Sequence, residues 1–280
     1  MDALPSIIQK ILPVVPAYAV ELAAYLALAL GLWAKLPPRW LTVALPAVAL
    51  LSYALLPQPH TQWWQLLGLV LIPSLWFAVL PRNRWLDLAF VAAMAIVLLS
   101  AGFNGLYSAP KADALGKAMW VRTGMIAVLY LGKEPGLNFG FWPTREEWRI
   151  GAREFLYLLP VIGLVGMLIS YWKLPSSPDW GKNALSGLGM FFGSLWFVAL
   201  WEEFFFRGLL QRWLGLPVAA VLFGLAHLPF RGFPNWKFAL LAMCAAVFYG
   251  RAFRAAGSVR AGMVTHALTN ATWVFVMGKV

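Results

Sequence analysis

Long apolar runs follow one another along most of this chain, and their length constrains the fold more than any other feature. A helix that crosses a bilayer needs about 20 mostly apolar residues, with about 17 as a working minimum. Nine runs approach this length: 12–33, 40–56, 63–80, 86–101, 155–172, 185–206, 215–230, 238–253 and 260–278. A shorter run at 118–132 could span, re-enter or lie on the surface. The sequence therefore predicts an all-α fold, a polytopic transmembrane bundle of about eight to ten helices.

The composition excludes the other fold classes. Of the 280 residues, 61% are apolar and only 12% are charged, with a mean hydropathy of +0.73. A soluble domain usually carries about a quarter charged residues, so this chain has too little charge to cover a globular surface. The same apolar excess excludes a disordered or collagen-like chain. A single cysteine, Cys244, excludes a disulfide scaffold.

The basic residues are distributed as in the loops of a membrane protein. The net charge is +11, but Lys and Arg occur in ones and twos between apolar runs, as at Arg82 and Arg84 or Arg251 and Arg254. Such spacing orients membrane helices and is not the clustered patch expected of a nucleic-acid-binding protein. If all ten runs cross, one side holds most of the Arg and Lys and is predicted to be cytoplasmic, with both termini outside. We expect an integral, multi-pass protein of the cell (inner) membrane.

The chain divides into three predicted parts. Residues 1–132 form N-terminal transmembrane helices to which no role is assigned, and their first run is retained because prolines and Glu21 interrupt it, unlike a signal peptide. Residues 133–154 form a polar, interfacial amphipathic segment, in which Glu146 and Glu147 are interpreted as a solvated helix start. Residues 155–280 form the transmembrane helices that carry the motifs.

The run 196–210 carries ionisable groups inside apolar surroundings, in the sequence WFVALWEEFFFRGLL. An ionisable side chain near mid-bilayer costs roughly 2.5 to 3.5 kcal/mol on insertion scales. Glu203 and Arg207 are four residues apart on one helical face, which favours an ion pair. Glu202 points about 100° away and is available for another contact. The alternative is a helix end in the headgroup layer from which Arg207 snorkels.

Two later runs add His227, His266 and Asn270. His266 and Asn270 are four residues apart on one face of the last run. Each polar residue alone could merely make hydrogen bonds between helices. The helical rise nevertheless places Glu202 and His266 within about 10 Å of the same membrane face, with His227 near enough to join them. The combination predicts one polar site assembled from three separate spans.

Such a site has the components of a peptide-bond hydrolase. A carboxylate and an imidazole can hold and deprotonate a water molecule, while a second imidazole and an amide can donate hydrogen bonds to the resulting oxyanion. A covalent nucleophile is not indicated: the chain has no G-x-S-x-G elbow, and Cys244 lacks the signature of an activated thiolate.

At these residues the chain resembles the CPBP (Abi) family, the intramembrane proteases related to type II CAAX prenyl endopeptidases and bacteriocin-processing enzymes. Glu202–Gly208 resembles its EExxxR motif, Phe223–His227 its FxxxH motif and His266–Asn270 its HxxxN motif, in the family's order. The resemblance covers about residues 185–275. It implies that Glu202 activates water with His227, that His266 and Asn270 stabilise the oxyanion, and that Glu203 and Arg207 support them.

Cofactor and substrate follow from the same resemblance. No cofactor is expected, although Glu202, His227 and His266 could supply the three protein ligands of a catalytic zinc ion. The expected substrate is a membrane-embedded or lipidated peptide or protein reached from the lipid bilayer. The alternative is a non-hydrolytic scaffold, pseudoprotease or transporter, because intramembrane Glu and His residues also mark proton relays.

Overall fold

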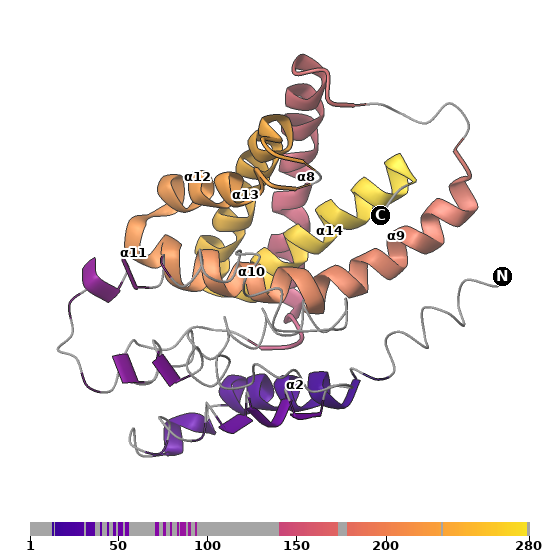
Figure 1. Cartoon of the computed structure of the whole chain (residues 1–280). Helices are drawn as coiled ribbons and strands as arrows, with labels where there is room; N and C mark the ends of the chain where they lie inside the picture. Colours follow the sequence, from indigo (N-terminus) through magenta and orange to yellow (C-terminus); the bar gives the residue numbers. More distant parts are fainter. Residues whose placement is uncertain are drawn as a thin grey trace. The chain divides into compact units, whose positions relative to one another are not determined.

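The computed structural model describes residues 140–172, 178–230 and 232–278, and, before them, residues 13, 15–30, 32–36 and scattered positions between 40 and 93. Every regular element in these ranges is helical, as the sequence predicts (Figure 1). The chain divides into two compact units, Met1–Gly136 and Leu137–Val280. Only scattered positions of the predicted spans 40–56, 63–80 and 86–101 are described, and the run 118–132 lies outside the described residues.

The described part of the first unit contains helix α2 (Val15–Ala29) and the short 3-10 helix η2 (Trp33–Lys35). The helix is shorter than the predicted span 12–33. A proline disfavours the helical conformation of the residue that precedes it, and Pro16 is tolerated because it lies in the first turn of α2. A buried stripe follows the helical period along α2 and consists of Ala17, Glu21, Ala24, Tyr25 and Leu28.

The second unit is a bundle built around its last helix. In chain order its elements are α8 (Arg145–Leu168), α9 (Trp180–Ser194), η3 (Leu195–Ala199), α10 (Leu200–Phe205), η4 (Phe206–Gln211), α11 (Arg212–Leu214), α12 (Leu216–Ala226), α13 (Trp236–Ala256) and α14 (Val259–Met277). Helix α14 packs against α8, α9 and α13, and α12 packs against α13. By length and composition, α8 and α13 could each cross a membrane.

Helix α8 corrects the predicted boundary between an interfacial segment and the span 155–172. One continuous helix runs from Arg145 through both. It begins there because Thr144 and Glu147 form a reciprocal capping box. The expectation of a solvated Glu pair is wrong for Glu147, which is buried and pairs with Arg260 at 2.9 Å. Glu146 is exposed and pairs with Arg149, as a solvated residue would.

The predicted span 185–206 is part of a longer helical stretch that runs without a break from Trp180 to Leu214. Two segments of it, η3 and η4, are π-helical. A π turn adds a residue to the helical turn, so the residues that follow are rotated by about 100° relative to an unbroken α-helix. These two segments enclose α10, which carries the first of the three motifs.

The predicted run 215–230 forms a helix only as far as Ala226. His227 caps α12 instead of lying inside it. The predicted close helix approach at Gly224 is confirmed, because a Cβ atom there would lie 2.7 Å from the carbonyl oxygen of Ala239 in α13.

Candidate active site

Glu202 and Glu203 face different surroundings, although they are neighbours in α10. Consecutive helical residues point about 100° apart. Glu203 is fully buried, whereas the Glu202 side chain keeps 32% of its surface exposed. The predicted ion pair is present, with Arg207 Nε 3.1 Å from Glu203 Oε2. Glu203 therefore belongs to the interior of the bundle, and Glu202 is the more accessible carboxylate.

Arg207 is buried between two aromatic rings. Its guanidinium carbon lies 4.6 Å from the ring centroid of Phe223 and 5.3 Å from that of Tyr249, and its Nη2 donates to the carbonyl oxygen of Ala246 at 3.1 Å. Burying a charge is costly unless it is paired and hydrogen-bonded, and aromatic faces attract cations. Arg207 therefore joins η4 to α12 and α13 and holds Glu203 in place.

His266 is fixed in one orientation by two contacts. Its Nδ1 lies 3.0 Å from Glu203 Oε1, and its ring stacks on Tyr249 with centroids 4.5 Å apart. An ionised carboxylate can only accept a hydrogen bond, so Nδ1 carries the proton. The other ring nitrogen, Nε2, then lies 3.9 Å from Glu202 Oε2. Glu203 thus determines which nitrogen of His266 faces Glu202.

His227 is fixed in the same way from the opposite side. Its Nδ1 lies 2.7 Å from the carbonyl oxygen of Phe223, which also can only accept, so this nitrogen carries the proton. Its Nε2 lies 4.0 Å from Glu202 Oε2. The hydrogen bond to Phe223 is possible because Phe223 lies one helical turn before His227, which caps α12.

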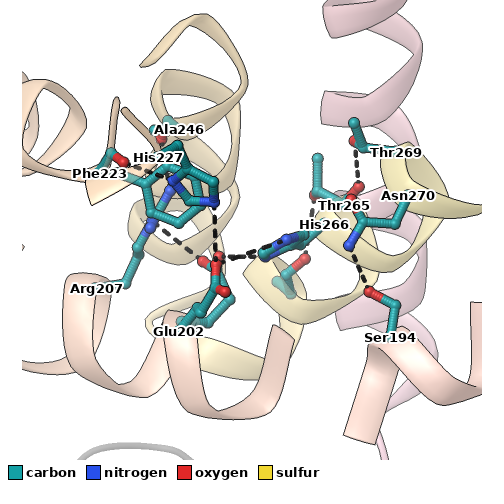
Figure 2. Close-up of polar contacts among 12 residues, drawn as sticks. Ser194, Glu202, Arg207, Phe223, His227, Ala246, Thr265, His266, Thr269 and Asn270 are labelled. Carbon is teal, nitrogen blue, oxygen red and sulfur yellow. Dashed lines mark hydrogen bonds and ion pairs between the residues drawn. The ribbon is translucent and has the colours of Figure 1, made fainter. Parts of the chain in front are cut away.

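The two imidazoles therefore present Nε2 to the same carboxylate oxygen (Figure 2). Both separations exceed a direct hydrogen bond. Within the described residues, Glu202 Oε2 is buried and has no hydrogen-bond partner. Polar atoms about 4 Å apart are suitably spaced for a bridging water. When the two rings are neutral, the lone pair of each Nε2 atom faces Glu202. The arrangement therefore favours a molecule that donates hydrogen bonds to these nitrogens and to the carboxylate.

Asn270 lies one turn beyond His266 on α14, and its amide nitrogen points toward Ser194 (Figure 2). Its Nδ2 donates to Ser194 Oγ at 2.7 Å. The structure thus brings three of the four predicted catalytic residues to one point and places the fourth beside them. Nearby Thr265 makes a hydrogen bond between helices, since its hydroxyl donates to the carbonyl oxygen of Gly151 in α8 at 2.9 Å.

Sequence analysis missed Ser194 and Tyr249. Both are buried, at 0% and 2% exposure. Ser194 ends α9, eight residues before Glu202, and no motif marks it. Tyr249 lies inside the apolar helix α13, where an aromatic residue ordinarily indicates core packing. Only their contacts with Asn270, His266 and Arg207 connect them to the site.

A zinc ion does not fit the site as it is arranged. Glu202, His227 and His266 have the chemistry of a catalytic zinc site. Ligands at 2.0–2.2 Å in a tetrahedron would lie about 3.4 Å apart, but the imidazole nitrogens lie 3.9 and 4.0 Å from the carboxylate oxygen. No group of three or more His, Cys, Asp or Glu in the described ranges is placed to hold a metal. We derive no step through a metal.

Ionisable groups buried among apolar helices define a class of membrane protein with a polar intramembrane site, which includes proteases and transporters. Residues 183–272 match the family described as type II CAAX prenyl endopeptidase Rce1-like. The match confirms the resemblance drawn from the three motifs. The family is one of membrane-integral proteases. No curated protein and no solved structure gave a match.

The matched segment covers about a third of the chain and contains all six predicted site residues. It begins in α9 and ends in α14, so α8 and the first unit lie outside it.

Proposed function

We propose that this protein is an intramembrane endopeptidase that hydrolyses a peptide bond of a membrane-associated or lipidated substrate. The observation that carries the proposal is the position of Glu202 Oε2, which lies 3.9–4.0 Å from Nε2 of both His266 and His227. A water held between the carboxylate and an unprotonated imidazole is oriented and can be deprotonated.

In the proposed reaction, Glu202 accepts a proton from water while the water oxygen attacks the carbonyl carbon. His227 Nε2 accepts a hydrogen bond from the same water. The carbonyl electron pair moves to oxygen, and the oxyanion accepts hydrogen bonds from His266 and Asn270. His266 Nε2 donates only when its ring carries two protons, and in that form its Nδ1 still donates to Glu203 Oε1. The C–N bond then breaks, and the leaving nitrogen takes the proton from Glu202.

The substrate class rests on the matched family, which acts on membrane-associated prenylated proteins. The apolar helices around the site agree with a substrate that approaches through lipid, in the cell (inner) membrane. The proposal includes no metal, because the described residues can provide the base, the oriented water and the oxyanion donors.

The test compares the wild-type protein with Glu202→Gln in liposomes. The probe is an internally quenched peptide that ends in an S-farnesylcysteine CAAX sequence. The amide keeps the size of the side chain but cannot accept the proton, so we expect cleavage to fall by about 10² to 10⁴. Glu146→Gln is the matched control, because Glu146 is exposed and pairs only locally. Equal cleavage by Glu202→Gln and wild type would overturn the proposal and favour a non-hydrolytic scaffold.

A further inference from the structure

We propose that Ser194 is a positioning residue that holds the side-chain amide of Asn270 in the orientation needed for oxyanion binding. The inference rests on the proposed function and assigns a role to a residue outside the three motifs. The carrying observation is the hydrogen bond of 2.7 Å from Asn270 Nδ2 to Ser194 Oγ. Ser194 has no exposed surface, so water cannot replace it as the acceptor without a rearrangement of the bundle.

An oxyanion donor works only when it is oriented before the reaction. The terminal torsion of an asparagine side chain is broad, so the side chain alone does not fix the amide plane. An amide nitrogen has two N–H donors. The bond to Ser194 uses one of them and fixes the plane. In the described part of the chain the second N–H has no protein acceptor, and it remains available to a substrate oxygen.

The acceptor role of Ser194 follows from its position in α9. A helical serine commonly donates its hydroxyl proton to the carbonyl of the preceding turn, which leaves the oxygen lone pairs to accept. Asn270 then contacts Ser194 through its amide nitrogen, and its amide oxygen lies on the other side of the amide group. The contact joins α9 to α14, two helices that Asn183 also joins through a 3.1 Å hydrogen bond to the carbonyl oxygen of Phe275.

Because Asn183 also links α9 to α14, the effect of Ser194 on Asn270 can be tested without separating the two helices. Because Asn183 and the extensive packing of the two helices remain, removing one buried oxygen should leave the helices in place. Ser194→Ala therefore removes the acceptor and little else. Ser194→Cys keeps the size of the side chain but offers only a weak acceptor, which provides a second variant with the same expected result.

The experiment measures kcat and KM for the farnesylated CAAX probe in liposomes. We expect Ser194→Ala and Ser194→Cys to lower kcat about tenfold with KM within twofold, because an oxyanion donor acts in the transition state. Asn270→Ala should lower kcat by about 10² to 10³. The double variant Ser194→Ala/Asn270→Ala should be no slower than Asn270→Ala, since Ser194 acts only through Asn270. The control is Ser186→Ala, the same change at an exposed position of α9.

Unchanged kcat in Ser194→Ala, a change confined to KM, or additive losses in the double variant would overturn the inference. A readout that needs no activity separates it from the proposed function. With selective ¹⁵N-asparagine labelling, the Nδ2 resonance of Asn270, identified by its disappearance in Asn270→Asp, should shift in Ser194→Ala and not in Ser186→Ala. If wild type fails to cleave the probe, the proposed function fails. In that case the Nδ2 resonance of Asn270 alone tests the inference. A shift in Ser194→Ala supports positioning by Ser194, and an unchanged resonance overturns the inference.

Discussion

Gly262 is the residue of α14 that gives the buried Glu203 carboxylate its space. A Cβ atom at this position would lie 2.6 Å from Glu203 Oε2 and 3.3 Å from the carbonyl oxygen of Tyr249, whereas ordinary contacts begin at 3.4 Å. In Gly262→Ala, Glu203 Oε2 must therefore withdraw by about 0.8 Å, the difference between these contacts. Glu203 Oε1 is 3.0 Å from His266 and Oε2 is 3.1 Å from Arg207, so a shift of this size disturbs the hydrogen-bond geometry of the carboxylate.

We expect Gly262→Ala to lower the free energy of unfolding by about 2 kcal/mol, within the 1–3 kcal/mol range of overpacked cores. Cleavage should fall as well, because His266 loses the group that orients it. Thermal unfolding in detergent, followed by tryptophan fluorescence, measures the first effect. Gly189→Ala is the control: it lies inside α9 with no described atom within 4 Å of the new Cβ, so it should be neutral or stabilising by up to about 1 kcal/mol.

A double-variant cycle tests the physical cause. Glu203→Ala removes the carboxylate that the new methyl group would displace. In that background Gly262→Ala should cost much less than in wild type, because the closest contact no longer exists. If Gly262→Ala is equally destabilising with and without Glu203, the reasoning from the carboxylate is refuted.

Two further outcomes are expected. Tyr249→Phe keeps the ring that stacks on His266 and lies over Arg207, so cleavage should change less than threefold. Tyr249→Leu removes the ring and should lower the free energy of unfolding by about 3 kcal/mol, with loss of most of the activity. Equal effects of the two variants would show that the ring face is unimportant. Chelation followed by elemental analysis should leave cleavage unchanged in metal-free protein, because no proposed step uses a metal, and a loss of activity that zinc restores would contradict this.

The sequence predicted the ion pair of Glu203 and Arg207 because the spacing of these residues follows the helical period. Glu203 and Arg207 are four residues apart, and that spacing alone places them on one face. The close approach at Gly224 followed similarly from a small residue in an apolar run. In each case the sequence pattern lies within one helix, where the spacing of residues determines which way their side chains point.

The sequence did not predict the directions of side chains that follow irregular helical turns. The π-helical segments on either side of Glu202 rotate the chain, and the sequence does not distinguish them: η3 contains no Gly or Pro, and the one glycine of η4, Gly208, belongs to the first motif. Ser194 therefore gave no sign that it would meet Asn270. The capping box of α8 joins Thr144 and Glu147, three residues apart, whereas the pairing of Glu147 with Arg260 joins residues 113 positions apart.

The sequence by itself determined that the chain is helical and apolar, which family its C-terminal segment resembles, and which few side chains are candidates for the chemistry, because composition and local spacing encode these properties. Only the tertiary structure decided which nitrogen of each histidine faces Glu202. For His266 that choice depends on Glu203 Oε1, which lies on a different helix. His227 is oriented by the Phe223 carbonyl oxygen of its own helix, and the packing of α12 places its Nε2 4.0 Å from Glu202 Oε2. A hydrogen bond between groups on different helices depends on how those helices pack, and packing is a property of the assembled bundle.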